Sequence, residues 1–203
     1  MEIRSNMQYN NRVKIIRESI LYQGWSTLIQ YVIDYIRSDQ HTETLVREIY
    51  DSGDGVVVLL YNSKTDKILL IRQFRLPVYL NGHPTGFILE CCAGLLDHHQ
   101  PESTAKKEIE EETGYRLQNI HKIYEAFATP GAHKEKIHYY YGLYDEQMQI
   151  SQGGGLITEN EDIEIIEYPY SQIPELLKSG AIIDSKTIIL LQWALLNKSV
   201  LLT

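Results

Sequence analysis

"AKKEIEEETGY", residues 105–115, places several acids at the end of an amphipathic pattern typical of a helix. Three of them are spaced i, i+3 and i+4, which puts their carboxylates on one helix face. These acids are Glu108, Glu111 and Glu112. Gly114 can adopt the left-handed conformation that ends a helix, so we expect a helix over residues 102–113. The helix dipole disfavours acids at this end, and like charges at this spacing repel. The crowding therefore indicates either a solvated acidic face or a site for a hard cation such as Mg²⁺ or Mn²⁺.

Apolar runs on both sides of this helix predict the strands of a buried sheet. "GDGVVVLLY", "KILLIRQF" and "GFILECCAG" precede the helix, and "IYEAFAT", "KIHYYYGLY" and "DIEIIEYP" follow it. Two further helical patterns, "IPELLKSG" and "SKTIILLQWALLNK", close the chain. Because strands and helices alternate over residues 53–198 without a linker, we expect the α/β class, with an α/β/α sandwich built on a mixed sheet.

The first part of the chain has a different pattern. Polar and apolar residues alternate over three short stretches, at residues 13–18, 27–36 and 44–50. This alternation predicts a small antiparallel sheet, so we divide the chain into an N-terminal β appendage at 1–52 and a main domain at 53–203. Three strands do not readily bury both faces of a sheet alone.

Composition limits the possible partners. The 203 residues include 19 basic and 27 acidic residues, a formal net charge of −8, which gives no general attraction for nucleic acid. No apolar run approaches the ~20 residues of a membrane span, and the N-terminus lacks the pattern of a signal peptide. We therefore expect a cytoplasmic protein that binds neither nucleic acid nor membrane. Cys91 and Cys92 are the only cysteines and lie in an apolar stretch, so we expect reduced core residues.

The segment "CCAGLLDHHQPESTAKKEIEEETGY" resembles the signature of the Nudix hydrolases: Gly, five residues, Glu, seven residues, then Arg-Glu-U-x-Glu-Glu-x-Gly-U with U apolar. Gly94 takes the first position. The second half is filled by Lys107, Glu108, Ile109, Glu111, Glu112, Gly114 and Tyr115. The resemblance implies a Nudix-type fold and a metal site in which Glu108, Glu112 and the backbone carbonyl of Ala93 bind Mg²⁺ or Mn²⁺. It also implies that Glu111 supports these ligands or binds a further ion through water.

Two positions depart from the signature. Gln100 replaces the upstream Glu, Lys107 replaces the Arg, and the spacing between them is one residue short. In the family this Glu and Arg brace the loop against the helix, so we expect a weaker hydrogen-bonding contact between Gln100 and Lys107. Neither change removes a metal ligand.

Beyond the signature, the chain resembles the branch that acts on nucleoside diphosphate sugars, and within it the bacterial GDP-mannose pyrophosphatases. The matching stretches include "LLIRQFR", "NGH", "ILECCAGLLD", "TPG" and "GGG" followed by "ENEDIE". This implies hydrolysis of GDP-mannose to GMP and mannose 1-phosphate, and a homodimer formed through the N-terminal strands. The ADP-ribose pyrophosphatases share the layout and remain an alternative. A second alternative is a Nudix-like module that binds a nucleotide sugar without cleaving it.

"GGGLITENEDIE", which begins at Gly153, combines three glycines with a cluster of acids. This composition favours a mobile loop that closes once substrate is bound. By similarity to the ADP-ribose enzymes, Glu159 is the first candidate for the catalytic base, and Glu161 is a metal ligand or an alternative base. Glu135, in "TPGAHKEK", is either an ion ligand or a solvated loop acid.

Arginines are the candidates for binding the substrate phosphates. Arg72 and Arg75 in "RQFR" are three apart, so in an extended chain they face opposite sides, and we choose Arg75 as the phosphate ligand. The alternative is that these side chains form surface ion pairs. Arg47 and Arg17, on the N-terminal appendage, are weaker candidates by the same chemistry.

Overall fold

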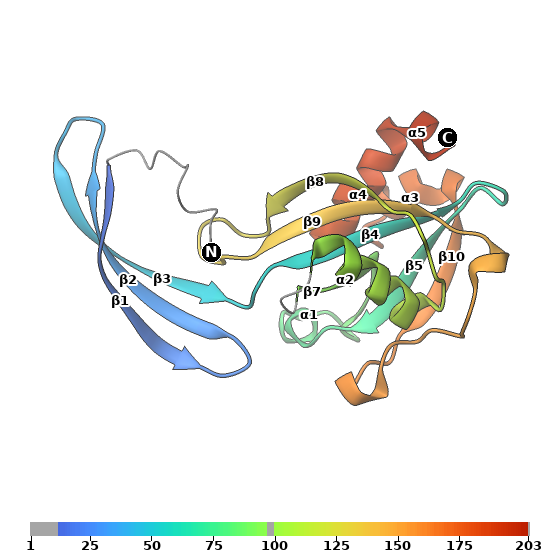
Figure 1. Ribbon diagram of the computed structural model, residues 1–203, viewed down its shortest axis with the longest axis horizontal. Coiled ribbons are helices and arrows are strands. Elements are labelled where there is room, and N and C mark those ends of the chain that lie inside the picture. Colours follow the sequence, from blue (N-terminus) through green and yellow to red (C-terminus); the bar gives the residue numbers. More distant parts are fainter. Residues whose placement is uncertain (1–11, 97–99, 203) are drawn as a thin grey trace. The chain divides into compact units, whose positions relative to one another are not determined.

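The computed structural model describes residues 12–96 and 100–202 (Figure 1), so residues 97–99 of the Nudix-like signature lie outside the described part. The chain divides into two compact units. The first consists of the chain up to Gly53 together with Phe127–Lys136. The second consists of Asp54–Ala126 and Ile137–Thr203.

The first unit contains a three-stranded antiparallel sheet, as the sequence predicts. Its strands, in the order β1-β2-β3, are β1 (Val13–Gln23), β2 (Thr27–Ile36) and β3 (Thr42–Asp51). Only Ile29 is buried among the residues of these three strands. On β1, large apolar side chains remain between 47% and 61% exposed: Val13, Ile15, Ile16, Ile20 and Leu21. The sheet therefore has no core of its own.

A loop from later in the chain, Phe127–Lys136, belongs to this first unit. The N–H of Tyr50 donates to the carbonyl of Ala132, and the N–H of Lys134 donates back to the carbonyl of Tyr50, both at 2.9 Å. The rings of Tyr50 and His133 also pack, with centroids 5.1 Å apart. These contacts fix the loop to the end of β3, an association that the sequence does not predict.

The second unit contains a mixed sheet of seven strands. They are β4 (Gly55–Asn62), β5 (Lys67–Phe74), β6 (Phe87–Glu90), β7 (Cys92–Leu95), β8 (His121–Phe127), β9 (Lys136–Leu143) and β10 (Glu164–Pro169). The order is β10-β5-β4-β9-β8, with β6 paired to β5 and β7 paired to β4. β4 and β9 run parallel, whereas β4 and β5 run antiparallel.

Helices cover both faces of this sheet, which confirms the α/β/α sandwich (Figure 1). The helices are α1 (Leu76–Leu80), α2 (Pro101–Glu108), α3 (Ile173–Lys178), α4 (Ser185–Leu196) and α5 (Lys198–Leu201). Alternate side chains of β4 enter two cores: Val57 and Leu59 pack with α3, α4 and α5, and Val56 and Val58 pack with α2. All eight residues of β4 are buried, as expected for a strand covered on both faces. Each fully buried aliphatic side chain contributes ~1.5–3 kcal/mol to folding.

The stretch "GFILECCAG" forms two strands instead of the single strand expected. β6 pairs with β5, whereas β7 pairs with β4, and the chain crosses between them at Cys91. The N–H of Cys91 leaves the ladder and donates to Thr187 Oγ1 on α4 at 2.7 Å, so a side chain far along the sequence makes the break. β4 and β5 pair directly only at residues 60–62 and 67–69. Beyond these residues β4 and β5 separate, and each pairs with a different strand, β7 with Ala93 and β6 with Glu90.

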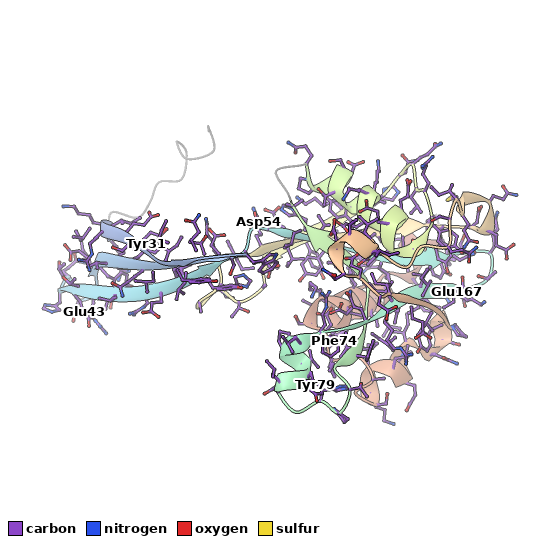
Figure 2. All side chains as sticks on the ribbon, turned by 90° about the horizontal axis from the view of Figure 1, so that it is seen from below. Tyr31, Glu43, Asp54, Phe74, Tyr79 and Glu167 are labelled. Atoms are coloured by element: carbon purple, nitrogen blue, oxygen red, sulfur yellow. The ribbon has the colours of Figure 1, made fainter. Side chains whose placement is uncertain are left out.

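α1 follows β5 directly and is not predicted by the sequence. Pro77 lies in its first turn, where a missing N–H costs little. Tyr79, on this helix, packs against Phe74 at the end of β5, with ring centroids 6.1 Å apart (Figure 2). Arg75, the residue before the helix, is thereby held between a strand end and a helix start.

Two smaller predictions can also be compared with the structure. Cys91 and Cys92 are free and buried, as expected for core residues. Within the described ranges, no helix is both long and apolar enough to cross a membrane.

Candidate active site

The acidic helix end lies in a backbone turn that differs from an α-helix. α2 continues without interruption into a π-helical turn, η2 (Ile109–Thr113), and Gly114 ends it with φ = 78°. The predicted boundary at Gly114 is confirmed, but the last turn is wider than expected. π turns are rare and frequently occur at functional sites.

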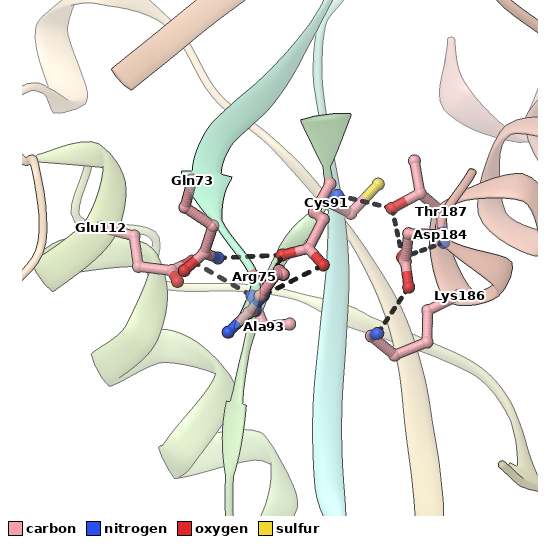
Figure 3. Close-up of polar contacts among 9 residues, drawn as sticks. Gln73, Arg75, Cys91, Ala93, Glu112, Asp184, Lys186 and Thr187 are labelled. Atoms are coloured by element: carbon pink, nitrogen blue, oxygen red, sulfur yellow. Dashed lines mark hydrogen bonds and ion pairs between the residues drawn. The ribbon is translucent and has the colours of Figure 1, made fainter. Parts of the chain in front are cut away.

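Glu112 and Glu108 both lie against β7. Glu112 is only 1% exposed, and its Oε2 accepts a hydrogen bond from the Ala93 N–H at 3.1 Å (Figure 3). A Cβ added to Gly94 would lie 2.2 Å from Cδ of Glu108. A side chain at the first position of the signature would therefore displace the Glu108 carboxylate from its place against β7.

Burial changes the acidity of these two residues. It raises the pKa of Glu112 to about 8, with a further contribution from the charge of Glu108, although bonds from the Cys92 thiol and the Ala93 N–H oppose the shift. Burial also raises the pKa of Glu108 to about 7. Lys107 opposes this second shift, whereas the neighbouring carboxylates increase it: Glu111, Glu161 and Glu159. The carboxylates of Glu159 and Glu161 are thus close enough to the helix end to raise the pKa of Glu108.

The donors at this site fit a divalent cation. Within the described part of the chain, neither Glu108 nor Glu112 has a Lys or Arg ion-pair partner, and a buried charge without a counter-charge is costly. Carboxylate oxygens are the ligands that Mg²⁺ and Mn²⁺ prefer. Among the described residues, no group of three His, Cys, Asp or Glu side chains is arranged to hold a metal. A third carboxylate would have to move toward these two, and backbone oxygens and water, which Mg²⁺ usually retains, would complete the coordination.

Glu111 has a partner of its own. Its carboxylate forms an ion pair of 2.9 Å with Lys107, one turn earlier. The sequence predicts that Lys107 contacts Gln100, and this is wrong: the Gln100 side chain is exposed, and its backbone carbonyl accepts bonds from Thr104 and Ser103. Lys107 therefore partly neutralises the acidic face instead of bracing the upstream loop.

The acid-bearing loop is bonded directly to the helix end. The N–H groups of Gly154 and Gly155 donate to the carbonyls of Glu112 and Glu111, at 2.9 and 3.0 Å. Glu159 lies in a single 3₁₀ turn, η4 (Ile157–Glu159). The Glu161 carboxylate accepts a hydrogen bond from the Leu156 N–H at 2.9 Å. The structure thus brings the predicted base candidates and the predicted metal ligands into one unit.

Arg75 and Arg72 both contact carboxylates. Nη2 of Arg75 lies 2.7 Å from Oε2 of Glu90, and its Nε lies 3.0 Å from the same oxygen. Gln73 donates to this oxygen at 2.9 Å, and Glu90 is only 3% exposed (Figure 3). Arg72 instead forms an exposed ion pair with Glu164 on β10. Arg75 therefore has a fixed orientation, and its Nη1 is not used by Glu90.

Sequence reasoning missed a second polar group near the break between β6 and β7. Asp184 caps α4 by accepting bonds from the N–H and the hydroxyl of Thr187, and Lys186 donates to Asp184 at 2.6 Å (Figure 3). Burial lowers the pKa of Arg75, but the carboxylate of Glu90 and then the charges of Glu112 and Asp184 raise it above its ordinary value. An Asp before "SKTIILL" is a recognisable N-cap signal, so the cap itself was predictable.

The remaining arginine candidates lie in the first unit. Arg17 is exposed on β1, and Arg47 is exposed on β3, where its Nη1 donates to the carbonyl of Val46 at 2.8 Å. Arg47 also lines a cavity of about 490 Å³ together with Arg12 and Arg37. Glu135, in the loop against β3, lies 3.4 Å from Nδ1 of His133.

Comparison with known proteins identifies the family. A model described as the NUDIX domain matches residues 51–191, and one described as the GDP-mannose pyrophosphatase NudK N-terminal domain matches residues 12–50. The GDP-mannose pyrophosphatase of Pectobacterium atrosepticum is 41% identical over 185 residues, which cover 91% of this chain and 95% of that protein. Proteins of the same description from Shigella flexneri and Escherichia coli are 40% identical over 182 residues, covering 90% of this chain and 94% of theirs. With its glutamates and glycine in the positions of the signature, the chain belongs to the Nudix family.

Proposed function

We propose that this protein is a Mg²⁺-dependent pyrophosphatase that hydrolyses a nucleoside diphosphate sugar, and that its substrate is GDP-mannose. The observation that carries the proposal is the pair of carboxylates packed against β7, buried Glu112 and partly buried Glu108, neither of which has a Lys or Arg ion-pair partner among the described residues. The substrate is supported by relatives named GDP-mannose pyrophosphatases that match about nine tenths of the chain. The products would be GMP and mannose 1-phosphate.

In this proposal, Glu108, Glu112 and the backbone carbonyl of Ala93 hold Mg²⁺ or Mn²⁺. A cation bound there would neutralise phosphate charge and lower the pKa of the attacking water. Glu161 contributes a further ligand once it is released from the Leu156 N–H. Glu111, already paired with Lys107, orients the helix end and moderates its charge.

The acid loop and the arginines complete the chemistry. Glu159 accepts the proton of the attacking water, and Glu161 is the alternative base. Arg75 binds a substrate phosphate through Nη1, because Glu90 occupies its Nε and Nη2. Arg72, Arg47 and Arg17 are retained as weaker phosphate ligands.

The N-terminal strands are proposed to form a homodimer. Apolar side chains of β1 are exposed along the strand, and burial of such a surface is the main source of free energy in protein association. A second copy supplies a matching surface through a two-fold axis. We also propose a boundary between residues 52 and 53, which separates the N-terminal dimerisation region from the Nudix domain. The proposed location of the protein is the cytoplasm.

The test is a product assay with purified protein, Mg²⁺ and a panel that contains GDP-mannose, ADP-ribose and other nucleotide sugars. We expect GMP and mannose 1-phosphate from GDP-mannose, and no turnover in excess EDTA. A preference for ADP-ribose would contradict the assignment of GDP-mannose as the substrate but would leave the proposed metal-assisted hydrolysis unchanged. Tight binding of a nucleotide sugar without any hydrolysis would overturn the enzyme and favour a sensor.

Glu159→Gln separates the base from the metal ligands in the same assay. This variant should bind Mn²⁺ as the wild type does but turn over slowly, since a single positioned base contributes ~10²–10⁴-fold. Turnover at the wild-type rate would show that Glu159 is not the catalytic base and would leave Glu161 as the candidate.

A further inference from the structure

The three consecutive glycines before the acid loop share an unusual backbone conformation. Gly153, Gly154 and Gly155 have φ values of 63°, 102° and 82°, all in the left-handed region that favours glycine. Such a run is commonly a flexible hinge, and the sequence favours that interpretation here. In the structure, however, the N–H groups of Gly154 and Gly155 are bonded to the carbonyls of Glu112 and Glu111. These are two of the carbonyls that a helix end leaves without a partner inside the helix.

The packing around two of these glycines leaves no room for a side chain. A Cβ on Gly153 would lie 2.5 Å from the carbonyl carbon of Thr113 and 2.7 Å from the carbonyl oxygen of Glu112. A Cβ on Gly155 would lie 2.6 Å from both Cβ and Oε2 of Glu161. Because the first contact is with backbone and the second with the base of a side chain, neither is relieved by a rotamer change.

The acid loop closes on itself immediately after the glycines. The Ile163 N–H donates to the carbonyl of Gly154 at 3.2 Å, and the Glu161 N–H donates to the carbonyl of Leu156 at 3.2 Å. Both ends of residues 156–161 are therefore held close to the glycine run. Its position relative to the helix is set by the two glycine N–H bonds.

We propose that Gly153 and Gly155 are positioning residues that hold the acid loop in a fixed register on the metal-binding helix. The carbonyls that accept the glycine bonds belong to Glu111 and Glu112, so the backbone that carries the carboxylates also carries the loop. The inference rests on the proposed function, because it assigns the loop acids and the helix acids to one reaction. A misplacement of about 1 Å between reacting groups can lower a rate by ~10²-fold.

Alanine variants test this proposal, with Gly180→Ala as the matched control. Gly180 has φ = 75° and nothing within 4 Å of an added Cβ, so the control carries the left-handed backbone strain without a steric clash. We expect Gly153→Ala and Gly155→Ala to lower kcat for GDP-mannose by about 10- to 100-fold. KM should change by less than about 2-fold, and Tm should fall further than in Gly180→Ala, because the steric clash adds to the backbone strain. A kcat equal to that of the control would overturn the proposal.

Amide hydrogen exchange of the wild-type protein supplies a readout that needs no variant and no turnover. A fixed register predicts slow exchange at Gly154 and Gly155, with and without Mg²⁺, because both N–H groups are bonded to carbonyls of the helix end. Fast exchange at both would mean a free hinge and would also overturn the proposal. If the wild type hydrolyses no nucleotide sugar, the proposed function fails, and the exchange rates still decide whether the loop is held on the helix.

Discussion

The two units of the molecule leave different groups uncovered. In the first unit, β1 exposes apolar side chains, and Ile29 is the only buried residue of the three strands. In the second unit, β4 is buried at all eight positions, and burial extends to the carboxylate of Glu112. The apolar side chains of the sheet have no cover within the first unit, whereas the carboxylates of Glu108 and Glu112 have no Lys or Arg ion-pair partner among the described residues. The comparison teaches that one chain leaves two kinds of group uncovered, and under the proposed function a protein surface would cover the first and a cation would bind the second.

Removal of the buried charge should have the largest effect. Glu112→Gln is expected to lower Mg²⁺-dependent kcat by ~10³-fold or more, about 4 kcal/mol, because a metal ligand is lost. The fold should persist, since a neutral isostere avoids burying a charge. The control is Glu110→Gln, on the same turn, whose carboxylate pairs with the exposed Arg116. Near-normal turnover of Glu112→Gln would contradict the assignment of Glu112 as a cation ligand.

A charge placed on the exposed sheet tests the other half of the comparison. Ile20→Lys on β1, at a position 58% exposed, should weaken the dimer by ~100-fold, about 2.8 kcal/mol, because a buried unpaired ammonium opposes association. Sedimentation or light scattering across a dilution series measures this. The control is Leu196→Lys on α4, which is 85% exposed and lies in the second unit. If both variants have the assembly of the wild type, the N-terminal sheet is not the dimer surface.

The ion pair at Arg75 sharpens the comparison inside the second unit, because there a buried carboxylate does have a partner. Arg75→Gln should destabilise the fold by about 2 kcal/mol, less than the ~3–5 kcal/mol of a fully buried pair, since the Arg75 side chain is 40% exposed. Glu90→Gln should cost about 1 kcal/mol, because the charge that it leaves unpaired, on Arg75, is 40% exposed and can be solvated. Urea unfolding gives both values.

Arg72→Gln is the matched control for this pair. Its ion pair with Glu164 is about half exposed on both sides, so its loss should cost less than ~0.5 kcal/mol. Equal losses for Arg72→Gln and Arg75→Gln would mean that the buried pair has no special role.

Features with a local cause could be predicted from the sequence. The apolar run of β4, the alternation over β2 and the glycine after the acids each fix an element by nearest-neighbour preference, and each is found. The glutamate spacing likewise predicts a shared helix face. Gly94 is the clearest case, because a fixed motif position corresponds to the close approach of the Glu108 side chain to β7.

Features that depend on a distant partner could not be predicted. The break at Cys91 requires the hydroxyl of Thr187, 96 residues away. The carboxylate that fixes Arg75 comes from β6, and its identity depends on where β6 pairs. Local patterns alone do not reveal such choices among competing partners.

The most direct test of the central claim, a divalent cation between Glu108 and Glu112, is the number of protons released on binding. Both carboxyls have a raised pKa, about 7 and about 8, so in the metal-free protein they stabilise the fold at low pH and lose this contribution as pH rises through those values. A metal binds only the ionised forms, so Mn²⁺ should displace about one to two protons at about pH 6.5 and almost none above about pH 9. Calorimetry in buffers of different ionisation enthalpy measures this. Mn²⁺ binding with no proton release across that range, or unchanged in Glu112→Gln, would contradict the account.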